Sequence, residues 1–331
     1  MFDIICIGGA VIDLFVNTAS ELITINDNIL SRKENLIAYP VGSKLLIKDF
    51  KKDFGGGAFN AAVSFSRLNL KTGFLGCLSK DENGRAILKK MIEENIEFLG
   101  HFSNEPNGFS IVLDSRDEER TILTYRGCNE IFDFKRIDKD KIRTKWFYLS
   151  SLHGKSFESS KKIVDFAIKN KNKIAFNPGT YLARLGFNEL RKIIENLNIL
   201  VLNKQEAQLI SEREDVKEQM VFLKNFVKDA VVVTDGKNGA YAYDSNYFYR
   251  SRVPKVKVKE TTGAGDAFSS SFVYGMIKKA DVEFALKCGI CNSISVVQNF
   301  GAQNILLKEK ELLKRIKNYN NLVKKSKNFI D

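Results

Sequence analysis

The stretch KETTGAGDAFSSSF, residues Lys259–Phe272, places two glycines around one alanine and follows them at once with a carboxylate. Gly263 and Gly265 let the backbone turn where a side chain would clash, so that successive N–H groups can point into one concavity. Apolar residues then recur every four positions across Phe268–Met276. This spacing predicts a helix that begins near Ala264 and buries one face.

A glycine turn that opens a helix is suited to hold an anion. The first N–H groups of the helix lack internal partners, and the helix dipole adds partial positive charge. Asp266 lies beside that position, where a carboxylate can accept a proton from a hydroxyl that attacks a bound phosphate. A simple glycine-capped turn would also fit the four letters GAGD, whereas the longer phrase TTGAGDAF is much more specific.

The composition is that of a globular α/β protein. The chain has 331 residues, of which 44% are hydrophobic, and we interpret 1–331 as a single domain. Its five cysteines are scattered and odd in number, which favours free thiols in a reducing compartment. The sequence has no basic leader and no uncharged apolar run of about 18 residues, so we expect a cytoplasmic protein without membrane contact.

The net charge of +12 does not by itself indicate nucleic-acid binding. The lysines are spread along the chain, and the densest basic run, Lys308–Lys327, alternates with Glu309 and Glu311. We therefore expect a basic amphipathic helix and a solvated tail in this run, and no nucleic-acid partner. A positive field also favours an anionic substrate such as ATP.

The N-terminal half combines one buried strand with short pieces outside the main sheet. Ile4–Ile7 is an apolar run typical of a buried parallel strand, and Asp13 follows its ligand-binding end. No G-x-G-x-x-G follows, which disfavours a dinucleotide-binding dehydrogenase. Alternating segments at about 14–50 and 108–126 predict a small β-sheet lid. Arg126 is either an ordinary surface charge or a residue that binds a polar or acidic group of the substrate.

A second glycine-rich stretch, GGGAFN at Gly55–Asn60, leads into a helix predicted over Ala58–Leu68. Three glycines permit a ligand to approach the backbone closely, and Asn60 offers both a donor and an acceptor one turn into the helix. No G-K-[ST] follows, so the stretch is not a P-loop, and a plain loop-to-helix cap is the alternative.

From Lys145 onward, apolar strands alternate with amphipathic helices, which predicts a parallel sheet covered on both faces. Three of these strands end in polar groups, at Asn177–Gly179, Asn203–Glu206 and Thr234–Gly236. The carboxyl ends of parallel strands meet at one edge of a sheet. We therefore expect these groups and the GAGD turn to form one site.

The phrase TTGAGDAF, the stretch GGGAFN, and the strand-end groups N-x-x-E and T-x-G resemble the signatures of the PfkB or ribokinase family of carbohydrate and nucleoside kinases. The resemblance extends from about Ile4 to Leu307. It implies a three-layer α/β/α ribokinase-like domain with a mostly parallel central sheet and a small β-sheet lid. It also implies transfer of the γ-phosphoryl group of ATP to a hydroxyl of a sugar or sugar-like molecule, with Mg²⁺ as cofactor.

The same resemblance implies roles for residues of this chain. Asp266 would be the catalytic base, and the backbone of Gly263, Ala264 and Gly265 would form an anion hole. Glu206 would hold Mg²⁺ through water molecules, which suits an ion that keeps several waters. The other implied contacts are to the acceptor from Asp13, Gly56, Gly57, Asn60 and Arg126, and to ATP from Asn203, Thr234, Gly236, Gly263, Gly265 and Asn292, the last on a helix predicted over Val282–Phe300.

The resemblance leaves the substrate and some partners open. Some family members hold a monovalent cation near the site, and this chain departs from the family pattern at Glu260 and Gly57. Candidate acceptors are ribose, fructose, a keto-deoxy sugar acid or, as the alternative, a nucleoside such as adenosine. The intact Gly263–Asp266 run disfavours a non-catalytic regulatory protein on this scaffold. Lid sheets of the family can pair between subunits, so a homodimer through the lid is a further hypothesis.

Overall fold

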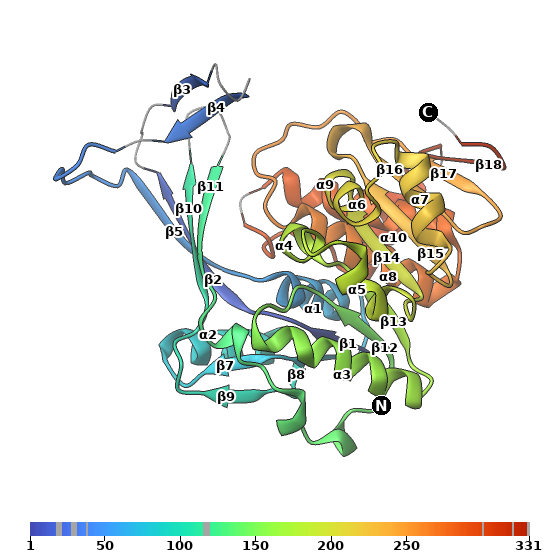
Figure 1. Cartoon of the computed structure of the whole chain (residues 1–331), viewed down its shortest axis with the longest axis horizontal. Helices are drawn as coiled ribbons and strands as arrows, with labels where there is room; N and C mark the ends of the chain where they lie inside the picture. The colour runs from blue at the N-terminus through green and yellow to red at the C-terminus, as the bar shows by residue number, and fades with distance from the viewer. Residues whose placement is uncertain are drawn as a thin grey trace.

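The structure is a computed structural model that describes residues 1–17, 22–27, 32–37, 39–114, 120–299, 301–319 and 321–329. These residues form three layers, helix, sheet and helix, with a smaller sheet that rises beside them (Figure 1). The prediction of a three-layer α/β fold with a mostly parallel sheet is confirmed. The predicted lid segments 14–50 and 108–126 lie partly outside the described residues.

The central sheet has the strand order β18-β17-β16-β15-β14-β13-β12-β1-β6-β8. All pairs from β15 through β8 are parallel, and the three pairs from β15 to β18 are antiparallel. Its strands are β1 (Phe2–Ile7), β6 (Thr72–Leu75), β8 (Ile96–Phe98), β12 (Thr144–Leu149), β13 (Lys173–Phe176), β14 (Ile199–Asn203), β15 (Ala230–Thr234), β16 (Ala240–Tyr243), β17 (Phe248–Ser251) and β18 (Val323–Ser326).

Strand β1 illustrates how the sheet builds two cores. Ile4 and Cys6 belong to one hydrophobic cluster, whereas Ile5 and Ile7 belong to the other, and all four are fully buried. Successive side chains of a strand point to opposite faces of the sheet. A strand with both faces covered therefore reads as a continuous apolar run, as the sequence of β1 does.

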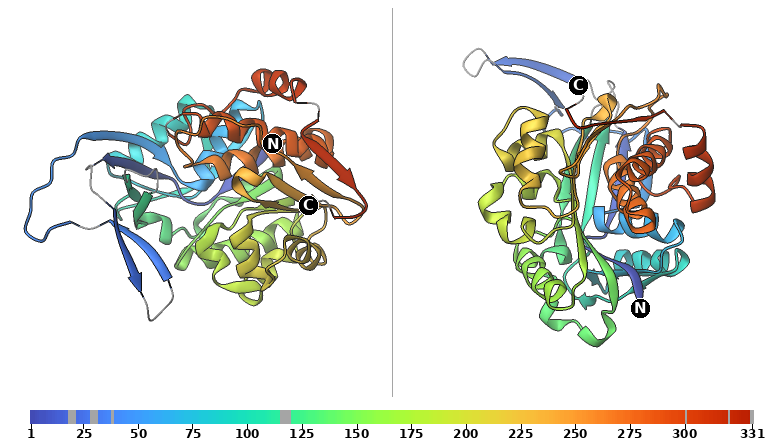
Figure 2. Two further views of the ribbon diagram at one scale, coloured as in Figure 1. Left: turned by 90° about the horizontal axis from the view of Figure 1, so that it is seen from above. Right: turned by 90° about the vertical axis from the view of Figure 1, so that its right-hand side faces the viewer.

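Helices cover both faces of the central sheet (Figure 2). One face is covered by α1 (Gly57–Arg67), α2 (Glu82–Glu93), α8 (Ala264–Lys279), α9 (Val282–Val297) and α10 (Glu309–Lys317). The other face is covered by α3 (Lys155–Lys169), α4 (Gly179–Ala183), α5 (Gly186–Ile194), α6 (Lys204–Ser211) and α7 (Val216–Lys224). In the described part of the chain, no helix is both long enough and apolar enough to cross a bilayer.

A second sheet, the lid, has the order β11-β10-β2-β5. Its strands are β2 (Val11–Asn17), β5 (Asp49–Gly55), β10 (Phe109–Asp114) and β11 (Arg120–Tyr125). Figure 1 shows it rising from the edge of the main body. Two small pairs accompany it, β3 (Leu22–Asp27) with β4 (Arg32–Ile37), and β7 (Cys77–Ser79) with β9 (His101–Ser103).

The C-terminal tail differs from its prediction. We expected a solvated tail after the basic helix, but Val323–Ser326 forms strand β18 and pairs with β17 at the edge of the central sheet. Phe329 then packs against Tyr241, with ring centroids 5.6 Å apart. The lysines of the tail masked this pairing in the sequence. Without β18, strand β17 would leave a row of unpaired N–H and C=O groups at the edge.

Candidate active site

The turn before α8 has the geometry that its glycines predict. Gly263 adopts the left-handed conformation, with φ of 80°, and α8 begins at the next residue. A β-carbon at Gly263 would lie 2.5 Å from the β-carbon of Ala302, so any larger residue would clash as well as strain the backbone. A β-carbon at Gly265 would meet nothing within 4 Å, because this position faces open space. The first N–H groups of a helix lack intrahelical partners, which suits Gly263–Gly265, which we call the anion turn, to hold an anion. The Ala264 N–H donates to the Thr261 carbonyl oxygen, at 3.2 Å, so the N–H groups of Gly263 and Gly265 are the ones that this turn offers.

Three neighbouring cavities meet at this turn. We name two of them, the nucleotide cavity and the acceptor cavity, after the ligands that the sequence analysis expects there. The nucleotide cavity, of about 450 Å³, and the middle cavity, of about 340 Å³, share Thr234 and Gly265. The acceptor cavity, also about 340 Å³, shares Asp266 with the middle cavity. The middle cavity therefore lies between the nucleotide cavity and the acceptor cavity. Asp266 lies where the middle cavity and the acceptor cavity meet.

The nucleotide cavity is mainly apolar. Thr234, Gly236 and Ala264 line it near the anion turn. Its other walls carry the apolar side chains that suit a flat base. These are Val253, Pro254, Val256, Val258, Phe268, Ile290, Ile294 and Val297.

The middle cavity contains the start of α6. The Asn203 side chain accepts a hydrogen bond from the backbone N–H of Glu206, at 2.8 Å, and the Glu206 carboxylate accepts one from the N–H of Asn203, at 3.0 Å. This reciprocal capping explains the N-x-x-E spacing. The second Glu206 oxygen accepts a hydrogen bond from Thr180 Oγ1, at 3.1 Å. Burial raises the pKa of Glu206, while these hydrogen bonds oppose the rise.

These residues fit a magnesium ion that keeps its waters. Among the described residues there is no group of three or more His, Cys, Asp or Glu side chains that could cage a metal. Glu206 is only 5% exposed, and both its carboxylate oxygens already accept hydrogen bonds. A carboxylate held in this way can still accept from metal-bound water, which matches the preference of Mg²⁺ for few carboxylates, several waters and substrate phosphates.

Arg126 is the one Lys or Arg among the described residues that line the acceptor cavity. Gly56 has φ of 96° and caps α1, and Gly57 follows it in the cavity wall. The Arg126 guanidinium lies 4.0 Å from the ring centroid of Tyr181 and forms a long ion pair with Glu130, at 3.7 Å. Burial, together with the nearby charge of Arg126, lowers the pKa of His153 to about 4. His153 is therefore neutral at physiological pH, and Arg126 supplies the positive charge of this cavity.

Asp266 is held by a single side-chain contact from α1. Asn60 Nδ2 donates a hydrogen bond to Asp266 Oδ2, at 2.8 Å. Burial raises the pKa of Asp266, and the hydrogen bond from Asn60 opposes the rise. The Asp266 carboxylate lines both the middle and the acceptor cavity, with Oδ2 fixed by Asn60. Its other oxygen, Oδ1, is available to a ligand.

Asp13 lies on the lid near this carboxylate. It is buried, and its cross-strand neighbour on β5 is Asp53. Burial raises the pKa of Asp13 to about 6; a hydrogen bond with Ser110 opposes the rise, and the charges of Asp53 and Asp266 add to it. An acidic group in this setting costs stability when it is ionised.

We expect Asp13→Asn to raise the free energy of unfolding at neutral pH by at most about 3 kcal/mol, at 1.36 kcal/mol per pKa unit. The folded state binds more protons than the unfolded state between about pH 4 and pH 6, so wild-type stability falls as pH rises through this window and is level above it. Urea unfolding of both proteins from about pH 5 to pH 7.5 measures the difference between their free energies of unfolding. A difference that does not change with pH would show that it does not come from ionisation of Asp13.

The structure brings most of the predicted site residues together, and three of them do not line the cavities described above. Asn60 is buried and does not line the acceptor cavity, because its amide is engaged by Asp266 and by Gln303. Asp13 does not line that cavity either. The contacts of these two residues with the acceptor stay predictions.

Asn292, which was predicted as a neighbour of the base, does not line the nucleotide cavity. Its side chain is fully buried, donates to Ser271 Oγ at 2.7 Å, and accepts from the Leu307 N–H at 2.9 Å. Its neighbour Ser293 lines the nucleotide cavity instead. One position along a helix turns a side chain by about 100°, so a small error in the predicted helix face exchanges the two residues.

Several residues of the site were absent from the sequence prediction. Thr180, which follows the polar strand end at Asn177–Gly179, lines the middle cavity. Its position next to that strand end was the available signal. In the acceptor cavity, Asn129, Ser150 and Ser151 carried no pattern of their own.

The chain matches known proteins over most of its length. The description "pfkB family carbohydrate kinase" matches residues 2–309. The 5-dehydro-2-deoxygluconokinase of Bacillus subtilis is 26% identical over 332 residues, covering 94% of each chain. The nucleoside kinase of Methanocaldococcus jannaschii, an archaeal member of the ribokinase family, has a TM-score of 0.77 at 22% identity, covering 96% of this chain and 99% of its own. A putative ribokinase II from E. coli, in complex with ATP and Mg²⁺, has a TM-score of 0.78 at 16% identity, covering 96% and 100%.

Proposed function

Because the chain belongs to the pfkB family of carbohydrate kinases, we propose that this ATP-dependent sugar kinase phosphorylates a keto-deoxy sugar acid of the 5-dehydro-2-deoxygluconate type. The observation that carries the proposal is the Arg126 guanidinium in the wall of the acceptor cavity. A carboxylate is the ordinary partner of such a group, which can donate two parallel hydrogen bonds to it.

The charge distribution of the acceptor cavity supports an acidic substrate. Glu130 lies 3.7 Å from Arg126, beyond hydrogen-bond distance, and is partly exposed, so it pairs only weakly with the guanidinium. A substrate carboxylate at hydrogen-bond distance would be the stronger partner. Asp266 lines the same cavity as Arg126. In the proposed binding mode the substrate carboxylate is at Arg126 and a hydroxyl at the far end of the sugar acid is at Asp266.

The proposed reaction uses the groups around the anion turn. The acceptor hydroxyl attacks the γ-phosphorus of ATP, the bond between that phosphorus and the bridging oxygen breaks, and ADP leaves. Asp266 accepts the hydroxyl proton. The N–H groups of Gly263 and Gly265 stabilise charge on the transferring phosphoryl group, whereas that of Ala264 donates to the Thr261 carbonyl oxygen in this structure, at 3.2 Å. Positioning supplies most of the remaining catalysis.

Magnesium has a defined place in this proposal. Glu206 would hold it through water, next to the phosphates in the middle cavity, with Asn203 fixing the carboxylate. When bound, Mg²⁺ neutralises phosphate charge. Glu260 is buried beside the anion turn, and its carboxylate accepts a hydrogen bond from the N–H of Thr262, at 3.1 Å. A monovalent cation near Glu260 remains a hypothesis from the family resemblance.

A nucleoside acceptor is the less favoured alternative. Stacking of a base requires aromatic or broad apolar walls. Among the described residues that line the acceptor cavity, Val11 is the only large apolar side chain, and the only aromatic ring is the imidazole of His153, with no Phe, Tyr or Trp. The lining is instead glycine, hydroxyl, amide and charged groups, which suits a polyhydroxylated acid.

A coupled ADP-release assay with MgATP tests the proposed acceptor. The panel holds 5-dehydro-2-deoxygluconate and another keto-deoxy acid, ribose and fructose as neutral sugars, and adenosine as a nucleoside. We expect the highest kcat/KM with a keto-deoxy acid. A higher kcat/KM with fructose, ribose or adenosine would overturn the sugar-acid assignment while leaving the kinase in place.

We also propose that the lid pairs with the lid of a second copy. Its outward face carries Phe50, Leu123 and Tyr125, which are 57%, 52% and 43% exposed. Strand alternation places them on the side away from Asp13. Exposed apolar groups on a small sheet mark an interaction surface, and a two-fold dimer would cover the same patch on both copies.

Sedimentation velocity measures this association. We expect wild type to sediment as a dimer and Leu123→Lys to shift toward monomer, because a buried unpaired charge opposes association. Val221→Lys is a matched control, since Val221 on α7 is also exposed but lies outside the lid. A monomeric wild type would contradict the proposed dimer.

A further inference from the structure

The loop between α9 and α10 lies directly beneath the anion turn. Ala302 contacts Gly263 so closely that a β-carbon on the glycine would lie 2.5 Å from the β-carbon of the alanine. Gln303, the next residue, is only 2% exposed although its side chain is polar. A buried polar side chain needs hydrogen bonds to offset its lost hydration, so its partners indicate why it is there.

Gln303 is the end of a chain of two side-chain amides that leads to Asp266. Gln303 Nε2 donates to Asn60 Oδ1, at 3.0 Å. Asn60 Nδ2 donates in turn to Asp266 Oδ2, at 2.8 Å. The three residues come from a loop, α1 and α8, which are far apart in the sequence, and both amides are buried.

The direction of this chain is set by charge. An ionised Asp266 can only accept hydrogen bonds, so Asn60 must present its NH₂ group to it. The Asn60 carbonyl oxygen then faces Gln303, which must present its own NH₂ group. The cost of this orientation is visible in Gln303 Oε1, which is buried with no hydrogen-bond partner among the residues that the structure describes. The reversed orientation would direct the Asn60 carbonyl oxygen at the carboxylate.

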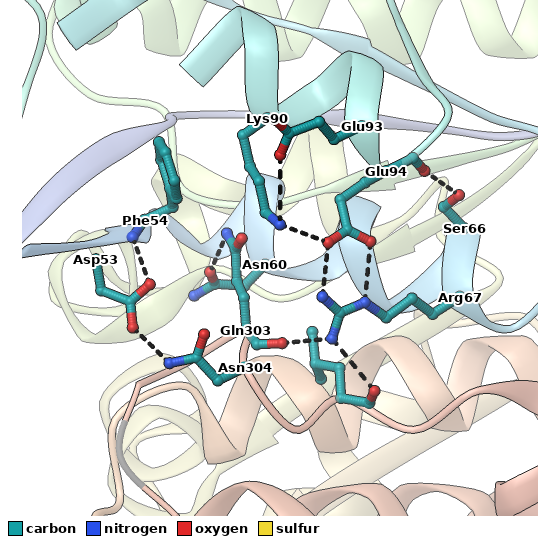
Figure 3. Close-up of polar contacts among 11 residues, drawn as sticks. Asp53, Phe54, Asn60, Ser66, Arg67, Lys90, Glu93, Glu94, Gln303 and Asn304 are labelled. Atoms are coloured by element: carbon teal, nitrogen blue, oxygen red, sulfur yellow. Dashed lines mark hydrogen bonds and ion pairs between the residues drawn. The ribbon is translucent and has the colours of Figure 1, made fainter. Parts of the chain in front are cut away.

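A guanidinium holds the loop that carries Gln303 (Figure 3). Arg67 Nη1 donates to the carbonyl oxygens of Gln303 and Leu306, at 2.6 and 3.3 Å. The other side of Arg67 forms a two-point contact with Glu94, at 2.6 and 2.9 Å, and Lys90 pairs with the same carboxylate at 2.8 Å. Bidentate contacts of this kind fix the plane of a guanidinium as well as its position.

We propose that Gln303 is a positioning residue for phosphoryl transfer, which fixes the Asn60 amide so that it donates to Asp266, while Arg67 clamps the loop that carries Gln303. This inference rests on the proposed role of Asp266 as the base. The amide chain keeps one carboxylate oxygen occupied and the other turned to the cavities. Gln303 touches neither substrate nor the reacting atoms, and its effect passes through Asn60.

Two substitutions separate this role from simple packing. Gln303→Met keeps the length of the side chain and removes its donor. Gln303→Glu also keeps the shape, but its ionised form only accepts, so Asn60 must turn its NH₂ group away from Asp266. The matched control is Asn304→Leu, at the next position of the loop, whose amide donates to Asp53 Oδ2 at 2.8 Å and takes no part in the chain.

Steady-state kinetics with MgATP and whichever acceptor supports wild-type turnover give the main result. We expect kcat to fall about 10-fold in Gln303→Met and further in Gln303→Glu, with the KM for ATP within about 2-fold of wild type. We expect Asn304→Leu to keep the wild-type kcat. Wild-type kcat in both Gln303 variants, or an equal loss in the Asn304 control, would overturn the proposal.

The pH profile of kcat provides a second readout. Loss of the Asn60 hydrogen bond raises the pKa of Asp266, so the acidic limb should move to higher pH in both Gln303 variants. The ionisable groups of Asp13, Glu206 and Tyr148 also interact electrostatically with the Asp266 carboxylate, but the Gln303 substitutions leave them in place. An acidic limb at the wild-type position in both variants would overturn the proposal.

If no acceptor of the panel supports wild-type turnover, the proposed function fails and the amide chain is tested without catalysis. Side-chain amide NMR of Asn60, assigned by its loss in Asn60→Asp, reports the contact. We expect its signals to move as Asp266 titrates in wild type and to lose this response in Gln303→Met. An unchanged response in Gln303→Met would overturn the proposal that Gln303 orients the Asn60 amide toward Asp266, independently of any kinase activity.

Discussion

Asp266→Asn is expected to lower kcat by about 10³-fold or more, because it removes the proton acceptor and keeps the shape of the side chain. The side chain lies where the middle and acceptor cavities meet, one position after the N–H groups of the anion turn. An asparagine can still accept the Asn60 hydrogen bond, so the packing around α8 should survive. The loss therefore reports proton transfer and not folding.

Calorimetry of MgATP binding is the control for this substitution. ATP is expected to bind the variant with nearly wild-type affinity, because the nucleotide cavity does not include Asp266. The variant should also unfold near the wild-type temperature. A turnover number close to wild type would exclude Asp266 as the base, and a lost ATP affinity would indicate a role in nucleotide binding instead.

Arg126→Met is expected to lower kcat/KM for a keto-deoxy sugar acid by about 10- to 100-fold, mainly through KM. A hydrogen bond to a charged group contributes about 1.5–3 kcal/mol, which corresponds to this range. Methionine keeps much of the contact with Tyr181 but removes the cation. The effect on kcat should be small, because Arg126 is placed at the end of the substrate away from the transferred group.

A neutral sugar provides the comparison for Arg126→Met. Its kcat/KM should change by less than about 3-fold. The ratio of kcat/KM for the sugar acid to kcat/KM for the neutral sugar should therefore fall in the variant. Arg126→Lys should restore part of the affinity, since it returns the charge without the planar pair of donors. Equal losses with the acid and the neutral sugar would show that Arg126 shapes the cavity and does not read a carboxylate.

Most of the fold could be predicted because its signals are local. The helix α8 begins at Ala264, as the glycine turn and the apolar spacing indicated. Strand β1 reads as an apolar run because both faces are buried. Two short elements were missed, the helix α6 and the C-terminal strand β18. The N-x-x-E group at the start of α6 is a local capping signal, but its eight residues are too few to show a clear helical repeat. Strand β18 forms by pairing with β17, a tertiary contact that no short window of sequence contains.

The candidate site was predictable where it consists of backbone and strand ends. Gly263, Gly265 and Asp266 follow one another in sequence, so their arrangement is a local property. The amide chain could not be predicted, because Gln303 and Asn60 are 243 positions apart and no local pattern relates one to the other. The same reason explains Asn292, whose partners become visible only when α8 and α9 pack together.

Phosphate analysis of the product formed from MgATP and 5-dehydro-2-deoxygluconate is the measurement that we would make first, with Asp266→Asn and Arg126→Met beside wild type. We predict a monophosphorylated sugar acid, formed with one ADP per product, with formation nearly abolished in the first variant and weakened through KM in the second. A wild-type protein that forms no phosphorylated sugar acid, but phosphorylates a nucleoside or a neutral sugar, would contradict the substrate assignment. Product formation that is unaffected by Asp266→Asn would contradict the mechanism.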